Sequence, residues 1–329
     1  MRYTGEVMQI RKQLGLFSFI ILVVGSAFLL LNIRQVSFAL LDWWAVRNYD
    51  PPAVIAQMVD DTGMSDRGQY LFYAGQPQLL DKSEFNSRCP LTEETFVLGC
   101  YSSRDIFLLD VEDPQLEPVE AVTSAHEMLH GVWERHSDDK QQELAKELVA
   151  AFEDINDKRL NELIDNYRDG TARDEDVIPN ELHSILATEI RELPESLEKY
   201  YAEYFTDRQK VVTLFESYEE VFANIEQQID DLESDIAGLK ERIESLESQI
   251  QSVKNELEAL NAEMKKDSDA GRVNEFNSKI PRQNALVKEF NTLVSSYNAS
   301  IKQHNEKVAK RNTLATQQND LIKSIDSKF

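Results

Sequence analysis

Apolar residues along the chain follow patterns that predict different elements, and the first pattern is an unbroken run. Residues 14–33 read LGLFSFIILVVGSAFLLLNI, without a charged side chain, which is long enough to cross roughly 30 Å of hydrocarbon as a helix. A cleaved signal peptide usually has a shorter apolar core that ends in small residues, whereas here residues 25–27 (Gly-Ser-Ala) lie in the middle. We therefore predict a transmembrane signal anchor over 14–33; a buried helix of a soluble domain is the alternative.

The basic residues around this run predict its orientation. Three precede it, at positions 2, 11 and 12, and only Arg34 follows it closely. The positive-inside rule then keeps residues 1–13 as a cytoplasmic tail and places the rest of the chain outside the cytoplasm. Trp43 and Trp44 suit the outer membrane interface, on a short amphipathic segment.

The C-terminal third follows a second pattern, a strict alternation of three and four residues between apolar positions. This spacing is typical of a coiled-coil seam. A polar turn, KKDSDAGR at 265–272, ends it, and a second helical stretch of similar length follows. We predict a long antiparallel coiled-coil hairpin over 208–329, with a parallel dimer of the first helix as the competing arrangement. The seam positions are Phe222, Ile225, Ile229, Leu232, Ile236, Leu239, Ile243, Leu246, Ile250, Val253, Leu257, Leu260 and Met264.

The return stretch repeats asparagine at every seventh position, and an asparagine buried in a coiled-coil seam fixes its register at a cost in stability. We expect the asparagines to do so here. Apolar β-branched residues recur three positions behind them. The asparagines are Asn277, Asn284, Asn291, Asn298, Asn305, Asn312 and Asn319, and the β-branched residues include Val287, Val294, Ile301, Val308 and Ile322.

Between the two apolar patterns, residues 34–207 mix helical periodicity with one run of strand formers. The strand candidate is Asp105–Val111. Helical spacing is present over 118–136, over 144–167, and from Pro179 to Pro194. We predict a mostly α, α+β domain with a small sheet.

The amino-acid composition argues against one class of partner and predicts a disulfide. The chain has 329 residues, with 35 Lys and Arg against 59 Asp and Glu, which argues against nucleic acid as a partner because phosphate binding needs clustered cations. Cys89 and Cys100 are the only cysteines. Outside the cytosol, we expect them to form a disulfide across their eleven-residue separation.

The residues that carry chemistry lie in VTSAHEMLHGVW, at 122–133. His126 and His130 are four apart on a predicted helix, so both imidazoles face one side and can bind one Zn²⁺. Glu127 is placed to take a proton from metal-activated water, as the general base of peptide hydrolysis. Two surface histidines on an amphipathic helix are the alternative interpretation.

At His126, Glu127 and His130 the chain resembles the zincin metallopeptidases. The resemblance implies a zincin-like catalytic domain over 34–207, in which the edge strand of a small sheet lines the cleft and pairs with an extended peptide. Asp105–Val111, just before the motif, is expected to be that strand. The resemblance does not extend to the coiled coil.

The third zinc ligand has three candidates. His136 lies six residues beyond His130, as in metzincins, but Trp133 stands where that pattern needs a glycine. Asn180-Glu181 resembles the segment that carries the glutamate ligand of gluzincins, although Ile185 stands where many members have an Asp that orients a histidine ligand. Glu189, two helical turns after Glu181, has apolar neighbours that suggest burial.

An electrophile that stabilises the oxyanion would complete the site. His183 and three tyrosines, Tyr200, Tyr201 and Tyr204, follow the ligand segment closely enough to supply it, although aromatic residues there are more typical of a core.

Two functions fit these patterns. The first is a membrane-anchored, zinc-dependent endopeptidase that acts on peptide or protein substrates outside the cytoplasm. The second is a non-catalytic cell-envelope scaffold, whose coiled coil binds a protein partner or self-associates and whose zincin-like domain is a relic or a structural zinc site. Glu127 favours the enzyme, because a structural zinc site needs no general base between its histidines.

Overall fold

The computed structural model describes residues 33–89, 98–171 and 177–327. Contacts divide the chain into two compact units, one running up to Glu219 and taking in the residues from Lys323 onward, the other formed by Glu220–Ile322. The predicted tail (1–13) and anchor (14–33) lie outside the described residues, apart from Ile33. Among the described residues no helix has the length and apolar character needed to cross a membrane.

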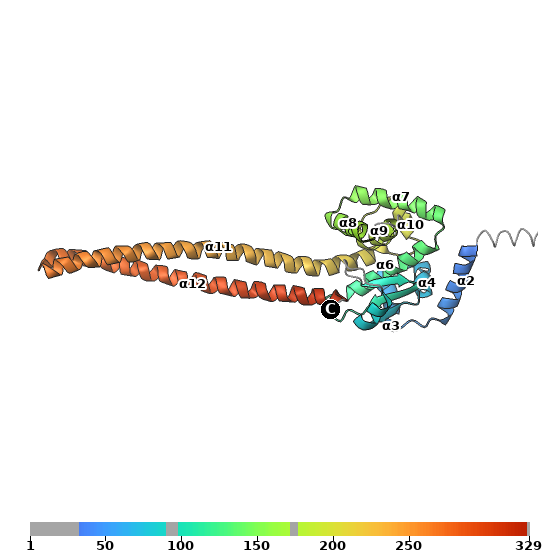
Figure 1. Cartoon of the computed structure of the whole chain (residues 1–329), viewed down its shortest axis with the longest axis horizontal. Helices are drawn as coiled ribbons and strands as arrows, with labels where there is room; N and C mark the ends of the chain where they lie inside the picture. The colour runs from blue at the N-terminus through green and yellow to red at the C-terminus, as the bar shows by residue number, and fades with distance from the viewer. Residues whose placement is uncertain (1–32, 90–97, 172–176, 328–329) are drawn as a thin grey trace, which may run out of the picture. The chain divides into compact units, whose positions relative to one another are not determined.

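The first unit is mostly helical with one small mixed sheet, as predicted (Figure 1). Its sheet has the order β1-β3-β2, with β1 parallel and β2 antiparallel to β3. The strands are β1 (Gln78–Leu80), β2 (Gly99–Ser102) and β3 (Asp105–Leu109). The helices are α2 (Ile33–Asn48), α3 (Ala53–Thr62), α4 (Asp66–Ala74), α5 (Lys82–Arg88), α6 (Pro118–Arg135), α7 (Asp138–Ile155), α8 (Lys158–Thr171), α9 (Val177–Glu189) and α10 (Glu195–Tyr201).

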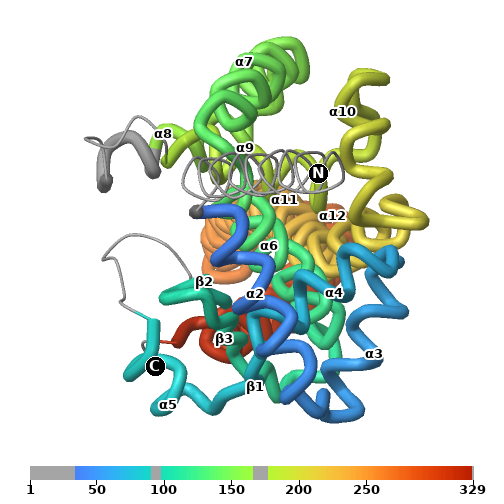
Figure 2. Tube along the Cα trace, turned by 90° about the vertical axis from the view of Figure 1, so that its right-hand side faces the viewer, coloured from blue at the N-terminus to red at the C-terminus, as the bar shows by residue number. Residues whose placement is uncertain are grey.

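Helix α6 is the centre of this unit and lies between the sheet and α9 (Figure 2). Its sequence is apolar on several sides, and twelve of its eighteen residues are buried. A helix that is buried on most of its circumference needs partners on each face, and α3, α4, α9, β2 and β3 all contact it. The HExxH motif therefore lies in the most enclosed helix of the unit.

Two expectations for this unit are wrong in detail. Asp105–Leu109 is a strand, but it is the central one, because the three-residue strand β1 pairs with its other side; the edge strand beside α6 is β2. The helical stretch at 144–167 is broken at Asn156, which adopts a left-handed conformation (φ 47°) and separates α7 from α8. The disulfide between Cys89 and Cys100 is confirmed.

The second unit contains most of the predicted antiparallel hairpin of α11 (Arg208–Asp269) and α12 (Val273–Ile325). Gly271 has a left-handed φ of 70° in the turn between them, a conformation that glycine adopts without strain. Ion pairs join the helices, among them Lys307 with Asp235 at 2.5 Å and Lys279 with Glu263 at 3.3 Å. Helix α12 covers the apolar seam of α11. A parallel dimer of the first helix, the competing arrangement, is therefore not required to bury that seam.

The heptad asparagines are not in that seam. All seven are exposed, and α12 contacts α11 through residues one position earlier and two positions later in each heptad, such as Leu286, Phe290 and Leu293. The expectation that buried asparagines fix the register of the hairpin is therefore wrong. Leucine and aromatic residues occupy about half of these seam positions and supply the hydrophobic stabilisation, while the others hold polar residues such as Gln283 and Arg311.

Candidate metal centre

The three motif residues occupy adjacent turns of α6. His126, Glu127 and His130 each offer one ligand atom, and these atoms lie within 4.8 Å of one another. The histidine rings are 4.8 Å apart between centroids and nearly perpendicular. Glu127 is buried, with 5% of its surface exposed. This group can hold a metal ion.

Helix α9 brings a fourth side chain to the group. The Glu181 carboxylate lies 3.6 Å from His126 Nε2 through Oε2 and 3.7 Å from His130 Nε2 through Oε1. Two atoms bound to one tetrahedral zinc at about 2.1 Å lie roughly 3.4 Å apart. The separations are thus close to those between ligands that share a zinc ion, and the donor set of two imidazoles and a carboxylate suits zinc.

Asn180 orients one of the histidines. His130 Nδ1 lies 3.0 Å from Asn180 Oδ1, and an imidazole that donates its Nδ1 proton there presents an unprotonated Nε2 toward Glu181. Hydrogen bonds of this kind set the tautomer and ring orientation of metal-ligating histidines. The sequence interpretation missed this role, although Asn180 immediately precedes the candidate ligand.

Glu189 points to a different partner. Its carboxylate pairs with Arg159 at 2.7 Å, and neither of the group's histidines is within ion-pair distance of it among the described residues. Burial raises the pKa of Glu189, and the Arg159 guanidinium opposes that shift. The apolar neighbours of Glu189 correctly indicated burial. Its charge is compensated by the guanidinium of Arg159, not by a metal ion bound to the histidines.

Glu127 lies beside the edge strand. The backbone N–H of Tyr101 donates to its carboxylate, and burial raises the pKa of Glu127 to about 7. Its Oε2 is buried and has no hydrogen-bond partner among the described residues. A buried carboxylate oxygen without a partner is costly, so stability alone does not explain this arrangement.

The remaining histidine and tyrosine candidates form a separate buried cluster. The Tyr200 hydroxyl lies 2.8 Å from both His136 Nε2 and His183 Nε2, and Tyr201 and Tyr204 are buried against it. The structure does not bring His136 to the metal group, because α6 ends at Arg135 and the chain turns away there. These aromatic residues belong to the core.

Two cavities border the group. The first, of about 290 Å³, is lined by His126 and Glu127 and by apolar side chains such as Val122 and Leu163, with Arg159 in its wall. The second, of about 660 Å³, has His130 and Asn180 in its wall.

Gly99 allows β2 to approach Glu127 closely. A β-carbon there would lie 2.5 Å from Thr123 Cγ2 and 2.8 Å from Glu127 Cγ. We expect Gly99→Ala to lower the free energy of unfolding by about 1–3 kcal/mol, because overpacking forces shifts of the neighbouring backbone and side chains. Urea unfolding of the full chain in detergent measures this change. Gly238→Ala is the control, since no atom lies within 4 Å of a β-carbon at Gly238; equal unfolding curves for the two variants would contradict the prediction.

Comparison of the chain with protein-family models, curated proteins and solved structures finds no match. What the structure itself provides is an HExxH helix, a glutamate from a second helix, and a small sheet beside them.

Proposed function

We propose that this chain is a zinc-dependent endopeptidase, with His126, His130 and Glu181 as the zinc ligands and Glu127 as the general base. The observation that carries the proposal is the approach of both histidine Nε2 atoms to the carboxylate of Glu181, beside a buried glutamate. Local helix geometry accounts for two histidines on one side of α6. It does not account for a carboxylate from another helix, fifty residues further along the chain, that faces both of them.

Each protein group has a definite task in hydrolysis. Zinc bound at this site would polarise the scissile carbonyl and activate a water molecule for attack. Glu127 accepts the proton of the attacking water and transfers it to the leaving amine. Asn180 keeps His130 in the tautomer that presents Nε2 to the site.

A peptide substrate is favoured by the surroundings of Glu127. Strand β2 is at the edge of the sheet and contacts α6, and an edge strand offers backbone groups to which an extended peptide can hydrogen-bond. The cavities beside the group give room for the substrate's side chains.

The proposed location is the outer face of a membrane. Leu40, Leu41, Trp43 and Trp44, on α2, are each more than half exposed, and α2 directly follows the predicted anchor at 14–33. Tryptophan and leucine at the start of an extracytoplasmic domain suit the lipid–water interface. The disulfide also favours an oxidising compartment.

Metal content of the full chain, purified in detergent, tests the proposal. We expect about one zinc per chain, and expect the ion to be lost in His126→Ala and in Glu181→Gln, because each removes one of three protein ligands. Glu189→Gln should retain zinc, since that carboxylate pairs with Arg159.

Glu192→Gln, an exposed position just beyond α9, controls for the loss of one negative charge, and circular dichroism checks the fold of every variant. A folded wild-type chain that binds no zinc after reconstitution would contradict the proposal and favour the scaffold function. Loss of zinc in Glu189→Gln but not in Glu181→Gln would assign the third ligand to Glu189.

A further inference from the structure

Helix α12 carries a second heptad repeat that the hairpin does not use. We call it the outer seam: the seven asparagines at every seventh position from Asn277 to Asn319, together with the residue three positions after each. Six of those seven partners are Ile or Val, and the other is Ala315. The outer seam thus has the alternating three- and four-residue spacing of a coiled-coil contact, shifted by one residue from the seam that faces α11.

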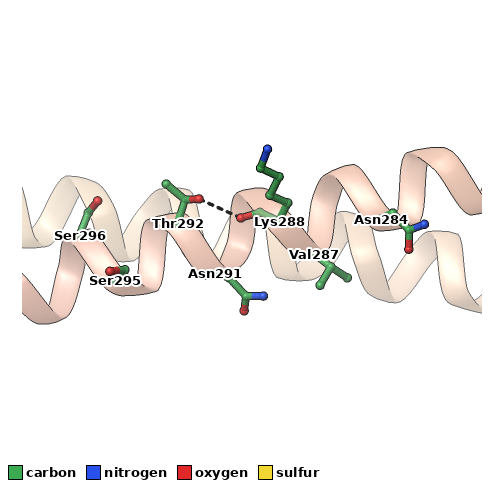
Figure 3. Close-up of a pocket in the computed structure, with 7 residues that line it drawn as sticks. All are labelled: Asn284, Val287, Lys288, Asn291, Thr292, Ser295 and Ser296. Atoms are coloured by element: carbon green, nitrogen blue, oxygen red, sulfur yellow. Dashed lines mark hydrogen bonds between the residues drawn. The ribbon is translucent and has the colours of Figure 1, made fainter.

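This seam lies beside the contact with α11, rotated by one residue around the helix. All seven asparagines are exposed, as are Ile280 and Val287, at 36% and 43%, whereas the other five partners are half-buried. Asn284, Val287 and Asn291 lie along one side of α12 (Figure 3), on a largely open surface that is lined by residues of α12 alone. Of the seven asparagines, only Asn305 makes a hydrogen bond to another side chain within the described chain, at 3.4 Å to His304.

The composition of the seam is unusual for a solvated helix face. None of its fourteen residues is charged, although 29% of the whole chain is. Exposed coiled-coil faces are typically charged, whereas apolar residues at this spacing pack into a partner helix. Asparagine offers both donors and an acceptor, so it can pair with an identical asparagine that faces it.

Charge indicates which helix of a second copy can approach. Helix α11 carries sixteen Asp and Glu against seven Lys and Arg, while α12 carries four against eight. Two α11 helices, each with nine more acidic than basic residues, repel each other more strongly than two α12 helices, each with four more basic than acidic residues. A symmetric contact between copies is therefore more favourable through α12 than through α11. A contact between two α12 helices also leaves each α11 paired with the cations of its own α12, as in Lys307–Asp235.

We propose that the outer seam of α12 binds the outer seam of α12 in a second copy of this chain. The contact extends over about 68 Å of helix, at 1.5 Å per residue from Asn277 to Ile322. Facing asparagines pair across it, and the Ile and Val side chains between them pack together. This proposal is independent of the proposed zinc site.

Sedimentation equilibrium of the full chain in density-matched detergent tests the proposal. We expect a dimer for the wild type and at least a tenfold weaker dimer for Asn298→Asp/Asn312→Asp, because each substitution places a negative charge in the contact between the copies with little change in side-chain size. Gln303→Asp/Gln317→Asp is the matched control. It introduces the same number of charges at the same fourteen-residue spacing, but these two exposed residues lie on the side of α12 opposite to the outer seam.

The control should dimerise as the wild type does, and circular dichroism should show equal helicity for all three chains. A wild type that stays monomeric at every concentration would overturn the proposal. So would equal dimerisation of the asparagine variant and the wild type, which would assign the contact to another part of the chain, or equal weakening in both variants, which would indicate a general effect of charge.

Discussion

Replacing Glu127 with glutamine should lower peptide hydrolysis by roughly 10²- to 10⁴-fold, the range that general acid–base catalysis contributes. Glutamine has nearly the same size as glutamate but cannot accept a proton at neutral pH. The Tyr101 N–H that binds the glutamate carboxylate can still donate to the amide oxygen, so the side chain should stay in place. The proposed zinc ligands His126, His130 and Glu181 are unchanged.

Two measurements distinguish this result from a loss of the site. Zinc content should stay at the wild-type value, and hydrolysis of a peptide library should fall. Glu143→Gln is the control, because Glu143 is an exposed residue of α7 whose partner is Lys140, and its activity should equal that of the wild type. Undiminished hydrolysis by Glu127→Gln would remove this residue from the mechanism, even if zinc were bound as proposed.

Asp42→Asn should strongly destabilise the first unit. Asp42 is 4% exposed; it accepts from Arg104 at 2.5 Å and from Arg135 at 2.7 Å and 2.8 Å. The ring of Phe38 lies beside both guanidinium groups, at 4.7 Å and 5.4 Å. Without the carboxylate, two adjacent cations would remain largely buried and unpaired, which typically costs about 3–5 kcal/mol.

This cluster connects α2 to the end of the HExxH helix, because Arg135 is the last residue of α6 and also donates to Gly131 O and the Tyr101 hydroxyl. We expect the midpoint of thermal unfolding to fall by roughly 6–12 °C, because a loss of about 3 kcal/mol in the free energy of unfolding shifts the midpoint by that amount in a unit of this size. Asp138→Asn is the matched control: it removes an ion pair to Arg34, also on α2, whose two side chains are 50% and 80% exposed. Such a pair contributes under about 1 kcal/mol. Equal midpoints for the two variants would contradict the prediction.

The features that the sequence by itself determined are those set by neighbours along one helix or one short loop. His126 and His130 share a face of α6 because residues four apart always do in a helix. The apolar three–four spacing of α11 predicts a coiled-coil contact for the same reason. The short separation of Cys89 and Cys100, together with the expected placement outside the cytosol, predicted their disulfide.

Only the tertiary structure decided between residues that are equivalent along a single helix. Glu181 and Glu189 lie two turns apart on α9, and no local property says which meets the histidines; the packing of α9 on α6 brings Glu181 there and leaves Glu189 with Arg159. Strand β3 is central because a three-residue strand, too short to show a pattern, pairs with its far side. On α12, two seams differ by one residue, and the contact with α11 covers the seam that contains Leu286, Phe290 and Leu293 and leaves the asparagines exposed. Periodicity identifies the faces of a helix, but which face meets which partner depends on contacts between residues far apart in the chain.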